Sequence, residues 1–301
     1  PSTPASGSDD MSSGIAGPYA TKLLADAGAD VVKVEGPAGD PLRRWTASGA
    51  DPGDEDSALF RYLNASKRAV AGGLDDPAVA ALVGAADVLV TDQATPGLDV
   101  DALAAAHPSL VVVTVTPFGT TGPWRDRPAD EFTLQGWCGS IASRGTPDRP
   151  PIAAGGRVGE WVAGAYAAVG AVAAWRVARS TGLGEHVDVA MLEAMTVTMN
   201  TFTPLFFAFT GAGPPPVPTP TIELPSIEPT ADGFVGFCTI VRQQFEDFLV
   251  LIDHAELLAD DELANATLRA RRMDEFLGYV RPWTTQHTTA EIVERASALR
   301  I

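Results

Sequence analysis

The chain has 301 residues, which is enough to bury one large core or two smaller ones. Its formal net charge of −17 favours solubility and excludes broad binding to nucleic acid or to an acidic membrane surface. Two cysteines, Cys138 and Cys238, lie far apart without metal-ligand spacing. This cysteine usage predicts a reduced, cytoplasmic protein with neither a disulfide framework nor a metal site.

The lysines of this acidic chain are placed unevenly. Lys22, Lys33 and Lys67 are the only three, and all of them precede residue 70. The N-terminal part is therefore the more suitable place for a phosphate-bearing ligand. A solvated surface without any ligand explains the same charges, and charge counting alone favours that interpretation.

Two segments bear on targeting and membrane association. The chain starts P-S-T-P-A-S-G-S-D-D, which is polar and lacks the apolar core of a signal peptide. We expect residues 1–13 to be loose. The apolar run from Trp161 to Trp175 is short for a membrane span and rich in Ala and Gly, so it predicts a buried helix.

Helical and strand patterns alternate through the first 116 residues. The helical patterns are Gly17–Ala27, Pro77–Ala86 and Val100–Ala106, and the strand patterns are Val31–Val34, Ala69–Ala71, Asp87–Thr91 and Leu110–Thr116. Such alternation is typical of an α/β fold with a mostly parallel sheet and helices on both faces. Ligands of such sheets bind beyond the carboxyl ends of the strands, so we expect a site among the loops after Val34, Thr91 and Thr116.

Several common catalytic and nucleotide-binding motifs do not occur in the sequence. No G-x-G-x-x-G follows the first predicted strand and no G-x-x-x-x-G-K-[ST] is found, which argues against a dinucleotide or P-loop site. There is no H-E-x-x-H and no G-x-S-x-G. The four histidines, His107, His186, His254 and His287, are isolated in sequence, which favours surface or capping roles over catalysis.

The segment from Gly155 to Ala194 places one carboxylate, Glu160, at the start of a long predicted helix. A glycine-rich approach leads to Glu160 in the first turn of a long predicted helix, which Gly182 ends. A short strand, His186–Ala190, and a second helix from Met191 follow. A carboxylate near a helix N-terminus interacts favourably with the helix dipole. On this segment alone, such a structural role for Glu160 is favoured over a catalytic role.

Composition changes near Phe202. Repeated prolines between residues 204 and 229 indicate a semi-rigid linker, although a meandering surface loop explains them equally. The predicted elements after it are a strand at Phe234–Ile240 and helices at Gln244–Ile252, Arg269–Val280 and Thr289–Ala298. We therefore predict a large α/β domain at residues 1–203, a linker at 204–229 and a small α/β domain at 230–301.

Four blocks of sequence, taken in order, resemble the class III CoA-transferases, a family that includes formyl-CoA transferase, carnitine CoA-transferase and α-methylacyl-CoA racemase. The blocks are A-G-P-Y-A at 16–20 with L-L-A-D-A-G-A-D-V-V-K-V-E at 23–35, L-N-A-S-K-R at 63–68, T-P-F-G-T-T-G-P-W at 116–124, and T-G-L-G-E-H-V-D-V-A-M at 181–191. The likeness extends over essentially the whole chain. It implies a Rossmann-like α/β sheet with a smaller α/β domain, in an interlocked homodimer.

The resemblance also implies a chemistry. In the family an aspartate four residues before a helix glycine attacks an acyl-CoA thioester, and a mixed anhydride and an enzyme–CoA thioester follow. Here Glu160 and Gly164 have that spacing, so Glu160 is the implied nucleophile, with amides of the glycine-rich approach as oxyanion donors. Acyl-CoA and a carboxylic acid are the implied substrates, without a tightly bound cofactor or a metal.

Carried over residue by residue, the family's CoA contacts fall on four short segments. They are Ile15 and Ala16; Leu63, Asn64, Ala65 and Ser66; Asp92, Gln93 and Ala94; and Arg127, Pro128, Ala129 and Asp130. Family members often have a basic residue where this chain has Gly36. We therefore expect contacts to the adenosine end either to be weaker here or to be supplied by Lys67, Arg68 or Arg43.

Departures from the family pattern keep two other hypotheses open. A non-catalytic CoA-ester-binding subunit is favoured by glutamate in place of aspartate and by the missing glycine-rich loop among residues 217–232. A racemase is less favoured, because Asp130 and Glu131 stand where that branch has a His-Asp pair. A polar tail replaces the strand that usually precedes Ala16, and relatives continue beyond the position of Ile301, so we expect the C-terminal return segment to be missing.

Overall fold

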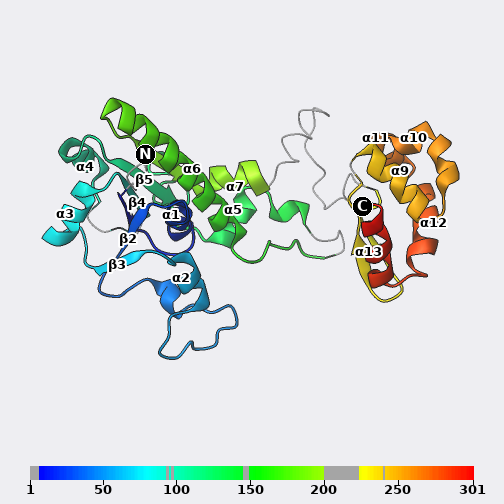
Figure 1. The fold of residues 1–301 in the computed structure, drawn as a ribbon, viewed down its shortest axis with the longest axis horizontal. Coiled ribbons are helices and arrows are strands. Elements are labelled where there is room, and N and C mark those ends of the chain that lie inside the picture. Colours follow the sequence, from blue (N-terminus) through cyan, green and yellow to red (C-terminus); the bar gives the residue numbers. More distant parts are fainter. Residues whose placement is uncertain (1–6, 93–94, 96–97, 145–148, 200–223, 240) are drawn as a thin grey trace. The chain divides into compact units, whose positions relative to one another are not determined.

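The computed structural model describes residues 7–92, 95, 98–144, 149–199, 224–239 and 241–301 (Figure 1). The chain divides into two compact units, Pro1–Pro218 and Thr219–Ile301, and each is described by itself. Most of the predicted linker lies outside the described residues. The three predicted domain limits therefore stay a prediction.

The first unit is built on one parallel sheet of six strands in the order β3-β2-β1-β4-β5-β6. The strands are β1 (Gly7–Met11), β2 (Asp30–Glu35), β3 (Arg68–Ala71), β4 (Val88–Asp92), β5 (Val111–Thr116) and β6 (His186–Ala190). Each neighbouring pair is parallel. The order reverses next to β1, so the loops after β1 and β4 meet at a topological switch point, and the predicted α/β class is confirmed.

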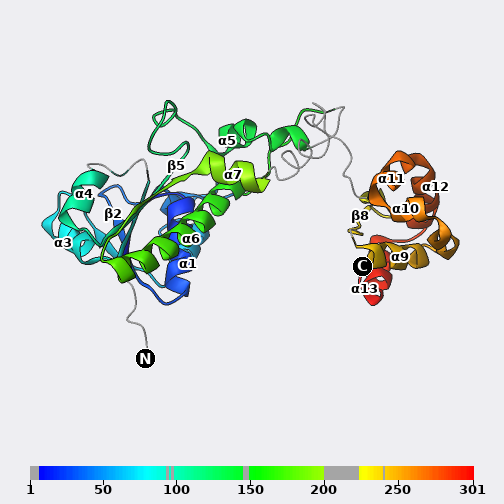
Figure 2. The same ribbon diagram turned by 90° about the horizontal axis from the view of Figure 1, so that it is seen from above.

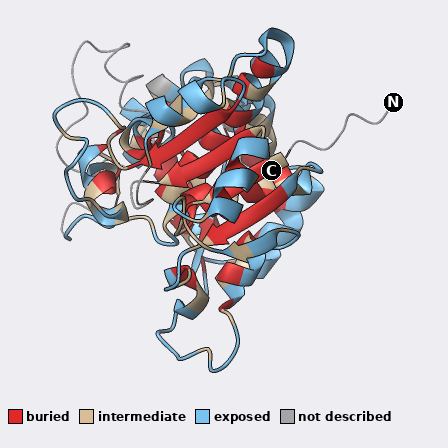
Figure 3. Cartoon of the chain, turned by 90° about the vertical axis from the view of Figure 1, so that its left-hand side faces the viewer, coloured by how far each residue is buried: buried red, intermediate tan, exposed pale blue. Residues whose placement is uncertain are grey.

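Helices cover both faces of this sheet (Figures 1 and 2). One face carries α1 (Ala16–Asp26), α6 (Val158–Thr181) and α7 (Met191–Met199), which share a core with β4 and β5. The other face carries α3 (Pro77–Ala85) and α4 (Val100–Ala106). Figure 3 shows the result, with buried strands enclosed between helices whose outer surfaces are exposed.

The long helix α6 buries a face of small residues. Gly164 is the tightest point, because a Cβ placed there would lie 2.5 Å from the carbonyl oxygen of Ala16 in α1. The larger side chains point the other way, and Tyr166, Val169 and Val172 are 46%, 71% and 43% exposed. The prediction of a buried helix is therefore right for one face only. Within the described residues α6 alone has the length and hydropathy of a membrane span, but its small residues belong to the core of the sheet.

The prediction that residues 1–13 are loose is wrong for part of this segment. Residues Gly7–Met11 are not loose but form β1, which pairs with β2 on one side and β4 on the other. No strand pattern is visible in these residues because their buried positions, Ser8, Asp9 and Asp10, are polar. Asp10 accepts hydrogen bonds from Thr21 and Lys67 and forms an ion pair with Lys33 at 3.7 Å. Burial alone would raise the pKa of Asp10, but the charges of Lys33 and Lys67 and the hydrogen bonds from Ser12 and Lys67 hold it far below its ordinary value.

Two short helices of the first unit were not predicted. They are α2 (Ala58–Leu63), which Ser57 caps at its N-terminus, and α5 (Glu131–Trp137), which Asp130 caps. Two 3₁₀ turns, Pro41–Arg44 and Ile141–Ser143, accompany them. Both helices have at most two turns, so the periodicity that reveals longer helices is too weak in them.

The second unit is mostly helical around an antiparallel pair of strands. Its elements are β7 (Ile227–Pro229), β8 (Phe234–Gly236), α9 (Arg242–Leu251), a 3₁₀ turn (Ala255–Ala259), α10 (Asp261–Ala264), α11 (Ala266–Arg271), α12 (Met273–Thr284) and α13 (Thr289–Ala298). Its own apolar core includes Phe245, Phe248, Phe276 and Ile292. The strand is shorter than predicted, and the helix expected at Arg269–Val280 is interrupted at Arg272. The last helix begins at Thr289 as predicted, and the side chain of Thr288 caps it by accepting a hydrogen bond from the amide of Glu291.

Adjacent aspartates of β1 should affect stability in opposite directions. Burial raises the pKa of Asp9 to about 6, and its Oδ2 is buried without a partner among the described residues. Because the folded chain then holds this proton more tightly than the unfolded chain, stability falls as the pH rises from about 4 to about 6. Asp9→Asn should remove this dependence and stabilise the protein at pH 7.5 by up to about 3 kcal/mol in urea unfolding.

The matched change on the other side of the strand is Asp10→Asn. It leaves two buried lysines short of a countercharge and should cost about 3 kcal/mol or more. If both substitutions destabilise the protein equally at pH 7.5, burial does not raise the pKa of Asp9.

Candidate active site around Glu160

The start of α6 places Glu160 at the edge of the sheet. Arg157 precedes the helix in the left-handed conformation, with φ of 55°, and Glu160 follows in the first turn. The indole nitrogen of Trp161 donates to the carbonyl oxygen of Gly156 at 3.0 Å, which fastens the glycine-rich approach to the helix. The Glu160 side chain is 12% exposed. A carboxylate in the first helical turn is thus largely withdrawn from solvent but remains reachable.

Both oxygens of Glu160 face the guanidinium of Arg157. Arg157 Nε donates to Oε1 at 2.6 Å and Nη2 donates to Oε2 at 2.7 Å, a two-pronged ion pair. The backbone amide of Ile15 donates to Oε2 at 3.2 Å. The structure thereby brings together two residues that the sequence analysis assigned to the site, the predicted nucleophile Glu160 and the predicted CoA contact Ile15.

Gly14 leaves room for this pair. Its φ is +71°, which favours glycine, and a Cβ built there would lie 3.6 Å from Glu160 Oε2 and 3.7 Å from Arg157 Nη2. The turn between β1 and α1 therefore forms one wall beside the carboxylate. A side chain at this position would cover the Glu160–Arg157 pair.

The protonation of Glu160 is set by opposing effects. Burial raises the pKa of its carboxyl group, while the charge and hydrogen bonds of Arg157 and the amide of Ile15 lower it. Glu131 adds a raising effect through like charge. The net direction is upward, so the pKa of Glu160 lies above its ordinary value.

Glu131, the first residue of α5, binds the N-terminus of α6. It accepts hydrogen bonds from the amides of Gly159 at 2.8 Å and Glu160 at 3.2 Å, and from the buried side chain of Gln135 at 2.8 Å. The sequence analysis considered Glu131 only as a counterpart of the racemase pair and missed this role. The amide of Gly159, expected as an oxyanion donor, already has Glu131 as its acceptor.

Other predicted CoA contacts meet the same edge of the sheet. Asp92, at the end of β4, accepts hydrogen bonds from the amide and hydroxyl of Ser13, at 2.7 Å and 2.9 Å. This joins the loop after β4 to the turn that leads into Ile15 and Ala16. Gln93 and Ala94 lie outside the described residues.

The segment from Leu63 to Ser66 has mainly structural contacts. Leu63 is fully buried, and the Asn64 side chain accepts a hydrogen bond from Lys67 at 2.9 Å. Ala65 and Ser66 are exposed, and Ser66 is left-handed with φ of 66°. Only the last two residues therefore offer an open surface to a ligand.

The basic residues that were expected to contact the adenosine end form ion pairs with carboxylates of the chain. The Lys67 side chain is 1% exposed and binds Asp10, so it is neither a surface charge nor a free phosphate ligand. Arg43 pairs with Glu35 and Asp56, and Arg68 pairs with Asp30. The expectation of a phosphate contact is therefore wrong for Lys67, because its charge neutralises the central strand.

The segment Arg127–Asp130 lies next to Glu131. Asp130 caps α5 by accepting the amide of Thr133 at 2.8 Å, which lowers its pKa. The exposed guanidinium of Arg127 lies over the ring of Trp124, 4.8 Å from its centre. An aromatic and cationic surface thus adjoins the start of α5, while Pro128 is exposed and Ala129 half-buried.

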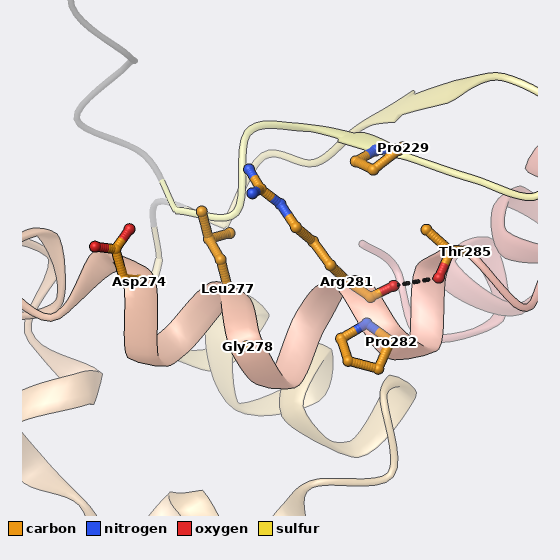
Figure 4. Close-up of a pocket in the computed structure, with 7 residues that line it drawn as sticks. All are labelled: Pro229, Asp274, Leu277, Gly278, Arg281, Pro282 and Thr285. Atoms are coloured by element: carbon orange, nitrogen blue, oxygen red, sulfur yellow. Dashed lines mark hydrogen bonds between the residues drawn. The ribbon is translucent and has the colours of Figure 1, made fainter.

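The second unit contains a separate open hollow of about 500 Å³ (Figure 4). Its lining is Pro229, Asp274, Leu277, Gly278, Arg281, Pro282 and Thr285. Arg281 extends from α12 toward β7, where its Nε donates to Glu228 at 2.9 Å. None of the predicted site residues lies there. Over the part of the chain that the structure describes, no group of three His, Cys, Asp or Glu side chains could hold a metal ion.

The pKa of Glu160 should respond in opposite directions to its two charged neighbours. Glu131→Gln removes a like charge and should lower this pKa, while Arg157→Gln removes the countercharge and should raise it. Carbon-13 NMR titration of labelled glutamate side chains measures both. Glu185→Gln, at an exposed position beyond the far end of α6, is the matched control and should leave the titration unchanged. Shifts of the same sign in both site variants would contradict this electrostatic account.

Comparison with known proteins places these observations in a family. The sequence pattern described as CoA-transferase family III matches residues 10–301. A succinate–glutarate CoA-transferase of Agrobacterium fabrum is 32% identical over 85% of this chain and 67% of its own length. A succinyl-CoA–D-citramalate CoA-transferase of Chloroflexus aurantiacus is 30% identical over 92% of this chain and 71% of its own.

For other relatives the match spans a smaller part of the relative's length, or the similarity shows only a shared fold. A subunit of succinyl-CoA:(R)-benzylsuccinate CoA-transferase from Thauera aromatica is 38% identical over 61% of this chain, and the match spans 47% of that protein. A solved CAIB/BAIF family protein from Brucella suis superposes with a TM-score of 0.79 at 26% identity, covering 98% of this chain and 81% of that one. A solved Mycobacterium tuberculosis protein, 24% identical over 99% of this chain and 82% of its own, has the same fold with a TM-score of 0.80. The chain belongs to CoA-transferase family III.

Proposed function

We propose that this chain is an acyl-CoA:carboxylate CoA-transferase whose nucleophile is Glu160. The observation that carries the proposal is the position of its carboxylate, 12% exposed in the first turn of α6 and hydrogen-bonded to the amide of Ile15. Relatives of this chain are named as CoA-transferases with several different acids. The donor and acceptor acids of this chain are therefore left open.

The proposed reaction conserves charge at each step. A Glu160 oxygen attacks the thioester carbonyl, a C–O bond forms, the C–S bond breaks, and CoA leaves as thiolate from a mixed anhydride. The thiolate then attacks the Glu160 carboxyl carbon, which releases the donor acid as a carboxylate and leaves a Glu160–CoA thioester. The acceptor carboxylate reverses these two steps, forms its own CoA thioester and restores ionised Glu160.

The residues around Glu160 have separable parts in this mechanism. Arg157 favours the ionised carboxylate that a nucleophile requires, and the amide of Ile15 can donate to an oxygen at the acyl centre. Glu131 keeps the start of α6 in place through the amides of Gly159 and Glu160. CoA would lie along the loops that hold Asp92, Ser66 and Arg127.

A non-catalytic CoA-ester-binding subunit is the second candidate. One observation favours it, because Arg157 engages both oxygens of Glu160 and so covers the nucleophile in this structure. Some relatives of this chain are named as subunits of CoA-transferases. A racemase has less support, since three hydrogen-bond donors already occupy Glu131 and Asp130 serves as a helix cap.

Loss of the Glu160 carboxylate should abolish covalent chemistry without abolishing binding. Incubation with acetyl-CoA should give an enzyme–CoA adduct that intact-mass spectrometry detects and hydroxylamine removes. Glu160→Gln keeps the size of the side chain, so calorimetry should still detect acetyl-CoA while turnover falls by at least about 1,000-fold.

Glu160→Asp is the matched variant that restores the family residue. It keeps the charge but withdraws the carboxylate by one methylene, and we expect about 100-fold lower turnover if the surroundings are built for glutamate. Full activity of Glu160→Gln would refute the nucleophile, and an adduct-free wild-type protein that binds acetyl-CoA would favour the subunit.

We further propose that the protein is a cytoplasmic homodimer. The outer face of α6 presents apolar side chains that the described part of the chain leaves exposed, with Val169 71% exposed and Val177 44% exposed. Tyr166 and Val172 continue this face along the helix. Isolated exposed apolar side chains are ordinary, but four on one helix are typical of an interface.

Light scattering should give the mass of a dimer, and dilution from about 100 µM to about 0.1 µM should leave that mass unchanged if the two chains are interlocked. Val169→Glu would bury a charge in such an interface and should lower the melting temperature by several degrees. A monomeric protein whose melting temperature is indifferent to Val169→Glu would contradict the dimer.

A further inference from the structure

Arg157 holds an unusual position beside the proposed nucleophile. Its guanidinium binds both oxygens of Glu160, at 2.6 Å and 2.7 Å, yet its side chain is 34% exposed and so also faces the outside of the site. Its backbone is left-handed at φ of 55°, a conformation that is uncommon and unfavourable for residues other than glycine. The approach to α6 thus directs a cation onto the carboxylate at a local energetic cost.

The charge of Glu160 changes during the proposed reaction, and this inference rests on that reaction. Glu160 is an anion at rest but neutral as an anhydride or as a CoA thioester. In each neutral state Arg157 loses its partner. The missing negative charge then resides on the CoA thiolate, on the departing donor acid or on the arriving acceptor acid.

We propose that Arg157 is the carboxylate-binding residue of the site, which exchanges Glu160 for the substrate acid when Glu160 is acylated. A guanidinium presents two parallel N–H donors that match a carboxylate, and it already makes this arrangement with Glu160. A partly buried cation without a countercharge is unfavourable, so the free acid is attracted when Glu160 is neutral. The ligand class is a carboxylate, bound at its reacting end.

The surroundings leave space for this exchange. Gly14 has no side chain beside Arg157 Nη2, and a Cβ there would already be in van der Waals contact at 3.7 Å. The amide of Ile15 lies on the same side of Glu160 and provides a further donor. A carboxylate that replaces Glu160 at Arg157 would thereby lie next to the acyl carbon that it must attack or leave.

Binding can be tested without turnover, because Glu160→Gln imitates the neutral state of the nucleophile. The amide oxygen of glutamine accepts from only one prong of Arg157, so the other donor becomes available. Calorimetry with acetate and with succinate should show at least tenfold tighter binding to Glu160→Gln than to the wild type. Glu160→Gln combined with Arg157→Gln should lose this gain. Glu160→Gln with Arg176→Gln, which removes an exposed arginine elsewhere on α6, should keep it.

Kinetics separate this inference from the proposed function. With acetyl-CoA, Arg157→Gln should form the enzyme–CoA adduct more slowly, because Glu160 loses its countercharge. KM for the acceptor acid should rise at least tenfold, while KM for acetyl-CoA changes much less. Arg157→Lys keeps the charge without the fork and should recover part of the loss. If the wild type forms no adduct, the proposed function fails, and calorimetry still decides the carboxylate site. If Arg157→Gln leaves KM for the acid unchanged, or Glu160→Gln binds acids no better than the wild type, the inference is overturned.

Discussion

The site depends on the contact between the backbones of α1 and α6. At Gly164 the helix has no side chain, and a Cβ there would lie 2.5 Å from the carbonyl oxygen of Ala16. This approach, one turn after Glu160, brings the carboxylate within hydrogen-bond distance of the Ile15 amide. A larger residue at position 164 would force the helices apart and separate the proposed nucleophile Glu160 from the loop that is expected to hold CoA.

The turn that contains Gly14 and Ile15 is also held in place by β1, the central strand that precedes it and that carries buried polar residues. β1 brings Asp10 into the core, where two buried lysines and Thr21 satisfy it. Breaking one partner of such a buried cluster is expensive because it leaves an uncompensated charge. The polar network therefore resists displacement of the turn that follows β1, and that turn contains Gly14 and Ile15. Basic residues that could have bound phosphate are used here to support the position of the site.

The sequence revealed the fold where apolar periodicity is strong. β4 and β5 were predicted within a residue of their bounds, since most of their buried positions are valine or leucine and the others are threonine, which is also β-branched. β1 was missed because Asp9 and Asp10 occupy such positions, and only the pairing with both neighbours shows that they are in a strand.

The candidate site divides in the same way. Glu160 and Ile15 came from a resemblance of ordered motifs, and the structure brings them together. The contact of Glu131 with Gly159 spans 28 residues of sequence and depends on how α5 is placed, so no local pattern could indicate it. Lys67 was assigned to the ligand because charge is visible in a sequence, whereas burial is not.

The length of the Glu160 side chain fits this geometry. The carboxylate crosses from α6 to the amide of Ile15 on α1, and its other contacts come from Arg157, three residues earlier in the chain. An aspartate would end one methylene nearer to the helix axis. The left-handed turn at Arg157 directs the guanidinium to the tip of the longer side chain, and Gly14 leaves that tip uncovered. The length of the Glu160 side chain therefore fits the position of Arg157 and the absence of a side chain at residue 14. These three features together suit the role of nucleophile that we propose for Glu160.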